Sequence, residues 1–246
     1  MMQQQPRTAV KAFLAVVLLL VSSHSLAQAV AVVTHLDGVL VVTHSNKSQK
    51  LLGINSEVFA GDTLTTAERT FARLKFKDES EIVLRPKTTF RIDEYIYDAE
   101  EPDSGSSILR LFKGGLRAVT GLIAKNKKEN FKVETPVAVV GIRGTNFGLI
   151  YCQDDCLELK TVSGDLPKNG LYSDVAEGAI ILTNTSGELL VNIGEYGFVA
   201  DSTSVPIQIP PVDGIRVTMP ISLSRNSMDG HGLGEANDQQ CMMPAQ

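Results

Sequence analysis

The chain has 246 residues, with 23 lysines and arginines against 28 aspartates and glutamates, which gives a net charge of −5 at pH 7. Proteins that bind nucleic acid are usually basic, so this balance argues against a nucleic-acid partner. With no tryptophan and 6% aromatic residues, the chain also has little material for stacking against sugar rings.

Residues 1–27 have the pattern of a secretory signal peptide. Arg7 and Lys11 precede an apolar run over residues 12–21, and Ser25-Leu26-Ala27 supplies small residues at a cleavage site. The run is too short for a membrane span, which needs about 20 residues. We therefore expect cleavage after Ala27 and a periplasmic or secreted mature chain. Its net charge is −7, because the leader carries two basic residues and no acidic one. The alternative is an uncleaved leader that serves as a membrane anchor.

From residue 28 onward, short apolar runs alternate with turn residues. Residues 29–33 and 38–43 flank Asp37-Gly38, which predicts a β-hairpin. Further short strands are expected over residues 72–76, 81–84, 108–112, 116–119, 157–162, 172–182, 189–193 and 196–200. The best helical candidate is residues 118–128, and Gly121 weakens it. The pattern predicts an all-β fold of stacked sheets, a β-roll or sandwich of short antiparallel strands and hairpins.

Basic residues gather between residues 110 and 132, against Glu129 alone. The set comprises Arg110, Lys113, Arg117, Lys125, Lys127, Lys128 and Lys132. On an acidic protein, such a reversal of charge could form a face that docks an anionic cell-wall or membrane component. The alternative is an ordinary solvated face.

The most informative stretch runs from Thr135 to Thr145. Pro136 favours an extended residue before it, and residues 137–140 form an apolar run that predicts a buried strand. Gly141 and Gly144 then predict a sharp corner, followed by a second strand that begins at Thr145. Arg143 at this corner could lie in solvent, lock the corner against carbonyl or carboxylate groups, or bind a ligand.

Together with residues 146–150, this stretch resembles the signature of the FecR domain. Gly61-Asp62-Thr63-Leu64, residues 177–181 and residues 194–198 also match that pattern, so the resemblance covers about residues 32–200. The family is an extracytoplasmic β domain best known from iron-dicitrate signalling. The resemblance therefore implies a FecR-like fold and a role in the cell envelope.

Two closely spaced cysteines predict a disulfide. Cys152 and Cys156 would lie roughly 13 Å apart in a straight strand, but a three-residue hairpin loop would bring them within bonding distance. An exported chain meets an oxidising compartment, so we expect a hairpin clasped by Cys152–Cys156. The alternative is two free thiols. The role of Cys241 is left open.

The chain changes character after residue 200. Four prolines and a glycine-rich stretch replace the alternating pattern, which favours an extended or disordered tail. The expected organisation is a signal peptide over residues 1–27, a FecR-like β domain over 28–200 and an irregular tail over 201–246.

Catalytic motifs are missing from the sequence. It contains no Gly-x-Ser-x-Gly, His-Glu-x-x-His or Cys-x-x-Cys pattern, so we expect no catalytic residues, no metal site and no cofactor. About eleven residues precede the apolar run, which leaves no room for a cytoplasmic sigma-regulator segment of the kind found in iron-dicitrate regulators. The sequence thus favours a stand-alone, non-enzymatic FecR-type module that presents sheet edges and loops to an envelope protein. The alternatives are a peptidoglycan-binding module and, less favoured, an unrecognised hydrolase.

Overall fold

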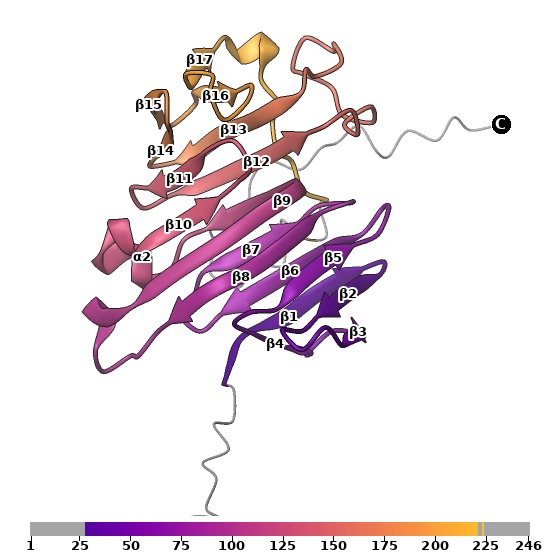
Figure 1. Cartoon of the computed structure of the whole chain (residues 1–246), viewed down its shortest axis with the longest axis vertical. Helices are drawn as coiled ribbons and strands as arrows, with labels where there is room; N and C mark the ends of the chain where they lie inside the picture. The colour runs from indigo at the N-terminus through magenta and orange to yellow at the C-terminus, as the bar shows by residue number, and fades with distance from the viewer. Residues whose placement is uncertain (1–27, 221–222, 224–246) are drawn as a thin grey trace, which may run out of the picture.

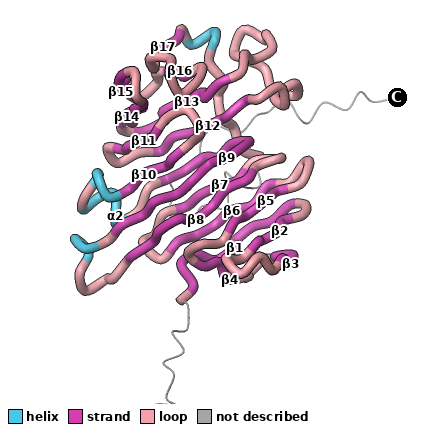
Figure 2. The backbone as a smooth tube through the Cα atoms, in the orientation of Figure 1, coloured by secondary structure: helices cyan, strands magenta, loops and turns pink. Residues whose placement is uncertain are grey.

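The computed structural model describes residues 28–220 and 223, and this part of the chain is built almost entirely of β-strands. Within residues 28–220, the helical elements are the α-helix α2 (Leu122–Asn126) and three short 3-10 turns: η1 (Pro102–Ser104), η2 (Lys128–Asn130) and η3 (Pro211–Asp213). Figure 2 shows how little helix accompanies the strands. The all-β expectation is confirmed. None of the described helices is long and apolar enough to cross a membrane.

The strands form two sheets that share one long strand, β9 (Ser106–Val119). Sheet A runs in the order β4 (Glu57–Phe59), β1 (Ala29–Asp37), β6 (Phe71–Phe76), β7 (Glu81–Leu84), β9, β12 (Asn146–Cys152), β13 (Gly170–Glu177), β16 (Tyr196–Val199) and β17 (Ile207–Ile209). Sheet B runs in the order β3 (Gln49–Leu52), β2 (Leu40–Thr43), β5 (Thr63–Thr66), β8 (Thr89–Ile96), β9, β10 (Phe131–Glu134), β11 (Val139–Ile142), β14 (Ala179–Asn184) and β15 (Gly187–Asn192). Figure 1 shows this progression from the indigo strands at one end to the orange strands at the other, with β9 in the middle.

Strand β9 passes from one sheet to the other at Gly114-Gly115. Its first half pairs with β8 and β10 in sheet B, and its second half pairs with β7 and β12 in sheet A. Gly114 has φ +79°, and a Cβ there would lie 2.6 Å from the Cα of Thr88. Only glycine fits this bend, because the backbone is left-handed and the neighbouring corner is too close for a side chain.

The main core fills the space between the two sheets. Period-two burial along the strands places Leu109 and Leu111 of β9 in this space, together with Phe90, Phe131 and Phe147. The outward side chains of sheet B, such as Ile108 and Arg110, are only half-buried.

The predicted hairpin at Asp37-Gly38 is wrong. Strand β1 pairs with β4 and β6 in sheet A, whereas β2 pairs with β3 and β5 in sheet B. Asp37-Gly38 is instead a corner between the sheets, and the amide of Val39 donates to Oγ1 of Thr70 in the neighbouring corner (2.9 Å). Turn residues mark a change of direction, but they do not say which strand becomes the partner.

The structure also differs from the expectation of an extended or disordered tail from residue 201. Strand β17 pairs with β16 at the edge of sheet A. Ile215, Val217 and Met219 are buried in a second hydrophobic cluster on the outer face of that sheet. The described residues 201–220 therefore pack on the domain, and their prolines shape an ordered path across it. The predicted signal peptide lies outside the described residues, as does Cys241.

Candidate functional site

The family-like stretch forms a hairpin turn followed by a corner. Oγ1 of Thr135 accepts from the amide of Ala138 (3.0 Å) and donates to its carbonyl oxygen (2.7 Å). These bonds fold residues 135–138 into the turn between β10 and β11. The predicted strand over residues 137–140 is therefore displaced: β11 spans Val139–Ile142 and includes Gly141.

Backbone contacts fix the corner that follows β11. The amide of Arg143 donates to the carbonyl of Ala179 (2.9 Å), and the amide of Thr145 donates to Oγ1 of Thr120 (3.0 Å). Gly178 packs so closely that a Cβ would lie 2.0 Å from the carbonyl oxygen of Gly144. The side chain of Arg143 is exposed and has no hydrogen-bond partner among the described residues. Of the alternatives for Arg143, the side chain thus lies in solvent. Pro136 lies in the turn between β10 and β11, Gly141 lies within β11, and Gly144 and Thr145 lie at the corner.

The disulfide Cys152–Cys156 is confirmed, with its Cα atoms 5.4 Å apart. The hairpin expected around it is wrong, because Cys152 at the end of β12 pairs with Gly170 at the start of β13. The bond instead closes a tight turn at the start of the loop over residues 153–169. The side chain of Asp155 supports this turn by accepting from the amide of Gln153 (2.8 Å).

Removing the disulfide should weaken the domain moderately. We expect the double variant Cys152→Ala/Cys156→Ala to lose about 2 kcal/mol of unfolding free energy, because so short a loop restricts the unfolded chain little. Urea unfolding of the oxidised protein and the variant measures this. Reduction of the unmutated protein should give the same loss; a change below about 0.5 kcal/mol in both would contradict the prediction.

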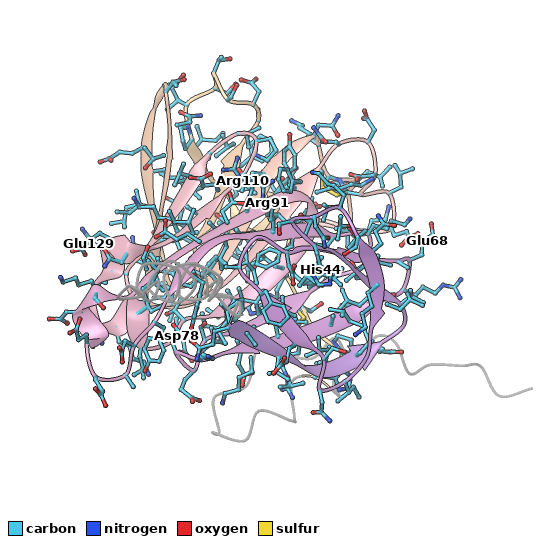
Figure 3. All side chains as sticks on the ribbon, turned by 60° about the horizontal axis from the view of Figure 1, so that its bottom comes forward. His44, Glu68, Asp78, Arg91, Arg110 and Glu129 are labelled. Atoms are coloured by element: carbon cyan, nitrogen blue, oxygen red, sulfur yellow. A yellow bond between two sulfur atoms is a disulfide. The ribbon has the colours of Figure 1, made fainter. Side chains whose placement is uncertain are left out.

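The structure does not bring the seven basic residues together on one surface. Arg117 is 2% exposed and lies under the C-terminal segment on sheet A. Arg110 projects from sheet B and pairs with Asp93 (2.7 Å) and with Glu134. Figure 3 shows Arg110 beside Arg91 and well away from Glu129, which lies in η2 next to Lys128.

The remaining basic residues are also spread over the molecule. Lys113 lies directly before the bend of β9 at Gly114-Gly115 and pairs with Asp155 (3.2 Å). Lys127 borders a surface hollow whose other walls include Glu100 and Glu101. Lys125 belongs to α2, and Lys132 points outward from β10. Acidic neighbours therefore offset much of the charge that the linear sequence concentrates.

A charged hollow of about 550 Å³ lies where the disulfide loop meets the corners of the N-terminal half. Lys87 reaches Glu68 (3.2 Å) and Glu158 (3.3 Å) across it, and these hydrogen bonds raise the pKa of Lys87. Among the described residues, no group of three His, Cys, Asp or Glu side chains is placed to hold a metal ion. The hollow is thus bridged by ion pairs that tie the disulfide loop to the domain.

The C-terminal end of sheet B presents a feature that the sequence reading did not single out. Strand β15 pairs with β14 only, so its other side is a free edge. Leu190 on this strand is 42% exposed, and Ile193 just after it is 64% exposed. The sequence predicted only an apolar strand over residues 189–193, near the end of the β region. Its position at an edge follows only from the pairing order.

The family model described as "FecR protein" matches residues 62–166, which lie within the region that resembles the FecR domain in sequence. No curated protein matches the chain.

Two solved structures of a candidate anti-sigma factor from Parabacteroides distasonis ATCC 8503 share 14% identity with the chain, at a TM-score of 0.44. The match covers 60% of this chain and 58% of that one, so the chain spans less than two thirds of the protein it matches. A "cell surface anchoring domain" matches 25% of this chain and 82% of its own length, at 24% identity and a TM-score of 0.25. Neither similarity is strong enough to carry an argument about function.

Proposed function

We propose that this chain is an exported, non-enzymatic FecR-type signalling module that binds an envelope protein through the free edge of β15. The observation that carries the proposal is an accessible edge strand with exposed apolar side chains at one end of sheet B. An extended segment of a partner can add to such an edge through backbone hydrogen bonds, while alternate side chains give specificity.

The direction of the backbone groups supports this use of the edge. The amide of Arg143 donates to the carbonyl of Ala179, so alternate residues of β14 face β11 and the others face β15. In the register of β14 and β15, the residues of β15 that face β14 alternate with residues that face outward. The backbone amide and carbonyl groups of Glu188, Leu190 and Asn192 therefore point to the free edge. The amide of Asn192 is capped by the carboxylate of Glu195 (2.7 Å), which leaves Glu188 and Leu190 for a partner.

The other sheet edges are less suited to strand addition. Strand β17 has three residues between Pro206 and Pro210, and proline cannot donate a backbone hydrogen bond. Strand β4 also has only three residues, and β3 carries Lys50, a residue type that discourages pairing between edges. The six residues of β15 contain neither proline nor lysine.

Blocking β15 should strongly reduce partner capture with little effect on folding. In cells that make the protein with a photo-crosslinking residue at Ile193, we expect Leu190→Pro to lower the yield of the crosslinked partner about tenfold, because it removes one outward donor and introduces a ring. Leu190→Lys should act in the same direction. Unfolding free energies should change by less than about 1 kcal/mol, since neither change removes a bond to β14.

The control is Leu51→Lys on β3, which is also exposed (66%) but lies at the opposite end of the molecule. It should leave the crosslink unchanged. An equal loss in all three variants, or a crosslink that survives Leu190→Pro and Leu190→Lys in folded protein, would refute the role of β15. Recovery of the protein from the periplasmic fraction, with the mass of a chain that begins at Gln28, would support export.

Peptidoglycan binding through the seven basic residues has less support, because they lie on several surfaces and Arg110, Lys113 and Arg117 already contact carboxylates. No arrangement among the described residues favours the hydrolase alternative.

A further inference from the structure

The outer face of sheet A is covered by the chain's own C-terminal segment. We call residues 210–219 the strap. Ile215, Val217 and Met219 of the strap are buried, whereas Arg216 between them is exposed, so every second side chain enters the face. They pack with Val83, Ile150 and Tyr172, which project from β7, β12 and β13. The strap thus lies across several strands like an extended peptide in a groove.

Charged side chains of the sheet hold the main chain of the strap. Oδ1 of Asp174 accepts from the amide of Val217 (3.3 Å), and Nη1 of Arg117 donates to the carbonyl of Val217 (2.9 Å). Nη1 of Arg85 donates to the carbonyl of Thr218. Residues 215–218 belong to no strand. All three hydrogen bonds are made to backbone groups of the strap. Any extended peptide segment has such groups and could form the same bonds.

The face of sheet A under the strap carries more positive than negative charge. The sheet contributes two positive side chains here, Arg85 and Arg117, and one negative side chain, Asp174. The strap contacts both arginines through neutral backbone carbonyl oxygens. Arg216 of the strap adds a further positive charge near Asp174, and Asp213 lies at the other end, near Tyr172. Burial lowers the pKa of Arg85 to about 10 despite the attraction of Asp174. A carboxylate next to Arg85 would therefore be stabilised there more than a carbonyl group is.

We propose that this face of sheet A is a peptide-binding groove which the strap occupies in cis, and from which an extended partner segment with an acidic residue near the position of Thr218 displaces it. Because Ile215, Val217 and Met219 are buried at every second position, the partner segment must carry apolar side chains at alternate positions. Because Arg85 and Arg117 are both positive, the segment must also carry a negative charge. This surface is separate from the edge of β15, so either site can fail without the other.

The first test stays within the full chain. Thr218→Glu should slow the opening of the strap, raising the hydrogen-exchange protection of the Val217 amide about tenfold over Thr218→Gln. Adding Arg85→Gln should remove that difference. The control Lys87→Gln changes a partly exposed lysine two residues away, which pairs with Glu68 and Glu158 and not with the strap, and should leave the difference intact. Equal protection in Thr218→Glu and Thr218→Gln, or a difference that persists without Arg85, would overturn the charge argument.

The second test supplies the ligand in trans. Fluorescent peptides of residues 210–223, carrying either Glu or Gln at position 218, are titrated into the unmutated full-length protein. The Glu peptide should bind about tenfold more tightly, and binding should weaken when the protein's own strap carries Thr218→Glu. No binding of either peptide, or identical affinities, would refute the groove even if the strap variants fail to fold.

Discussion

Replacing Arg117 by methionine is expected to lower the free energy of unfolding by about 3–5 kcal/mol, because it leaves a buried carboxylate without its partner. Nη1 of Arg117 lies 2.9 Å from Oδ2 of Asp174, and its Nε donates to Oδ1 of Asn146 (2.9 Å). Methionine fills much of the same volume but supplies none of these donors. The loss should therefore come from the uncompensated charge and the lost hydrogen bonds, since little cavity forms.

The destabilisation should depend on pH in a definite direction. Burial is the largest influence on Asp174 and raises its pKa, while Arg117 is the main group that opposes this rise. Without Arg117, the folded-state pKa moves further above the unfolded-state value. A carboxyl shifted upward gives its full stability below the unfolded pKa and loses it as the pH rises through the folded pKa. The deficit of Arg117→Met should thus be largest near pH 7 and shrink towards about pH 4.

Arg110→Met provides the matched control, because Arg110 lies on the same strand and also contacts carboxylates. Its side chain is partly exposed, so the change should cost less than about 1 kcal/mol. Urea unfolding at both pH values measures all three proteins. A deficit of Arg117→Met that is the same at pH 4 and pH 7 would show that Asp174 is not its cause.

Replacing Gly121 by alanine is expected to cost about 3 kcal/mol, the upper end of what overpacking a core causes. A Cβ at this position would lie 2.0 Å from the carbonyl oxygen of Asp78 and 2.4 Å from the amide nitrogen of Ser80. Both atoms are backbone and cannot rotate away. The carbonyl of Asp78 also accepts from the amide of Leu122 (2.7 Å), so relief of the clash would break the contact that starts α2.

Gly141→Ala is the control for this prediction, and it tests the most family-like stretch of the chain. A Cβ at Gly141 would come no closer than 3.9 Å to another residue, the carbonyl oxygen of Ile181. Alanine should therefore be neutral or stabilise the strand by about 0.5–1 kcal/mol. Denaturation curves of the two variants decide the matter. If Gly141→Ala proves as damaging as Gly121→Ala, steric crowding is not the reason for these glycines.

Local features of the fold could be read from the sequence. The alternation of apolar and polar residues predicted strands such as those over residues 72–76 and 81–84, which the structure shows as β6 and β7. The spacing of Cys152 and Cys156 predicted their bond, because only a turn brings cysteines so close in sequence within reach. Gly144 was expected at a corner and has φ +70° there.

Partners distant in the sequence could not be read in the same way. The basic run between residues 110 and 132 looked like one face, yet Arg117 faces Asp174 under the strap while Arg110 faces Asp93 on the other sheet. The bend of β9 at Gly114-Gly115 separates them, because it moves the strand from sheet B to sheet A. A run of like charges in the sequence shows that basic residues are close along the chain. The bend of the strand determines which of them is buried.

The amino-acid sequence by itself determined the secondary-structure class, the position of several corners, the disulfide and the resemblance to the FecR domain, since all of these depend on residues near one another in the chain. The tertiary structure decided which strands pair, that β15 ends as a free edge and that residues 210–219 cover the outer face of sheet A. The physical reason is that backbone pairing and burial are set by neighbours in space, and a period-two strand fits many neighbours equally well until the whole roll is assembled.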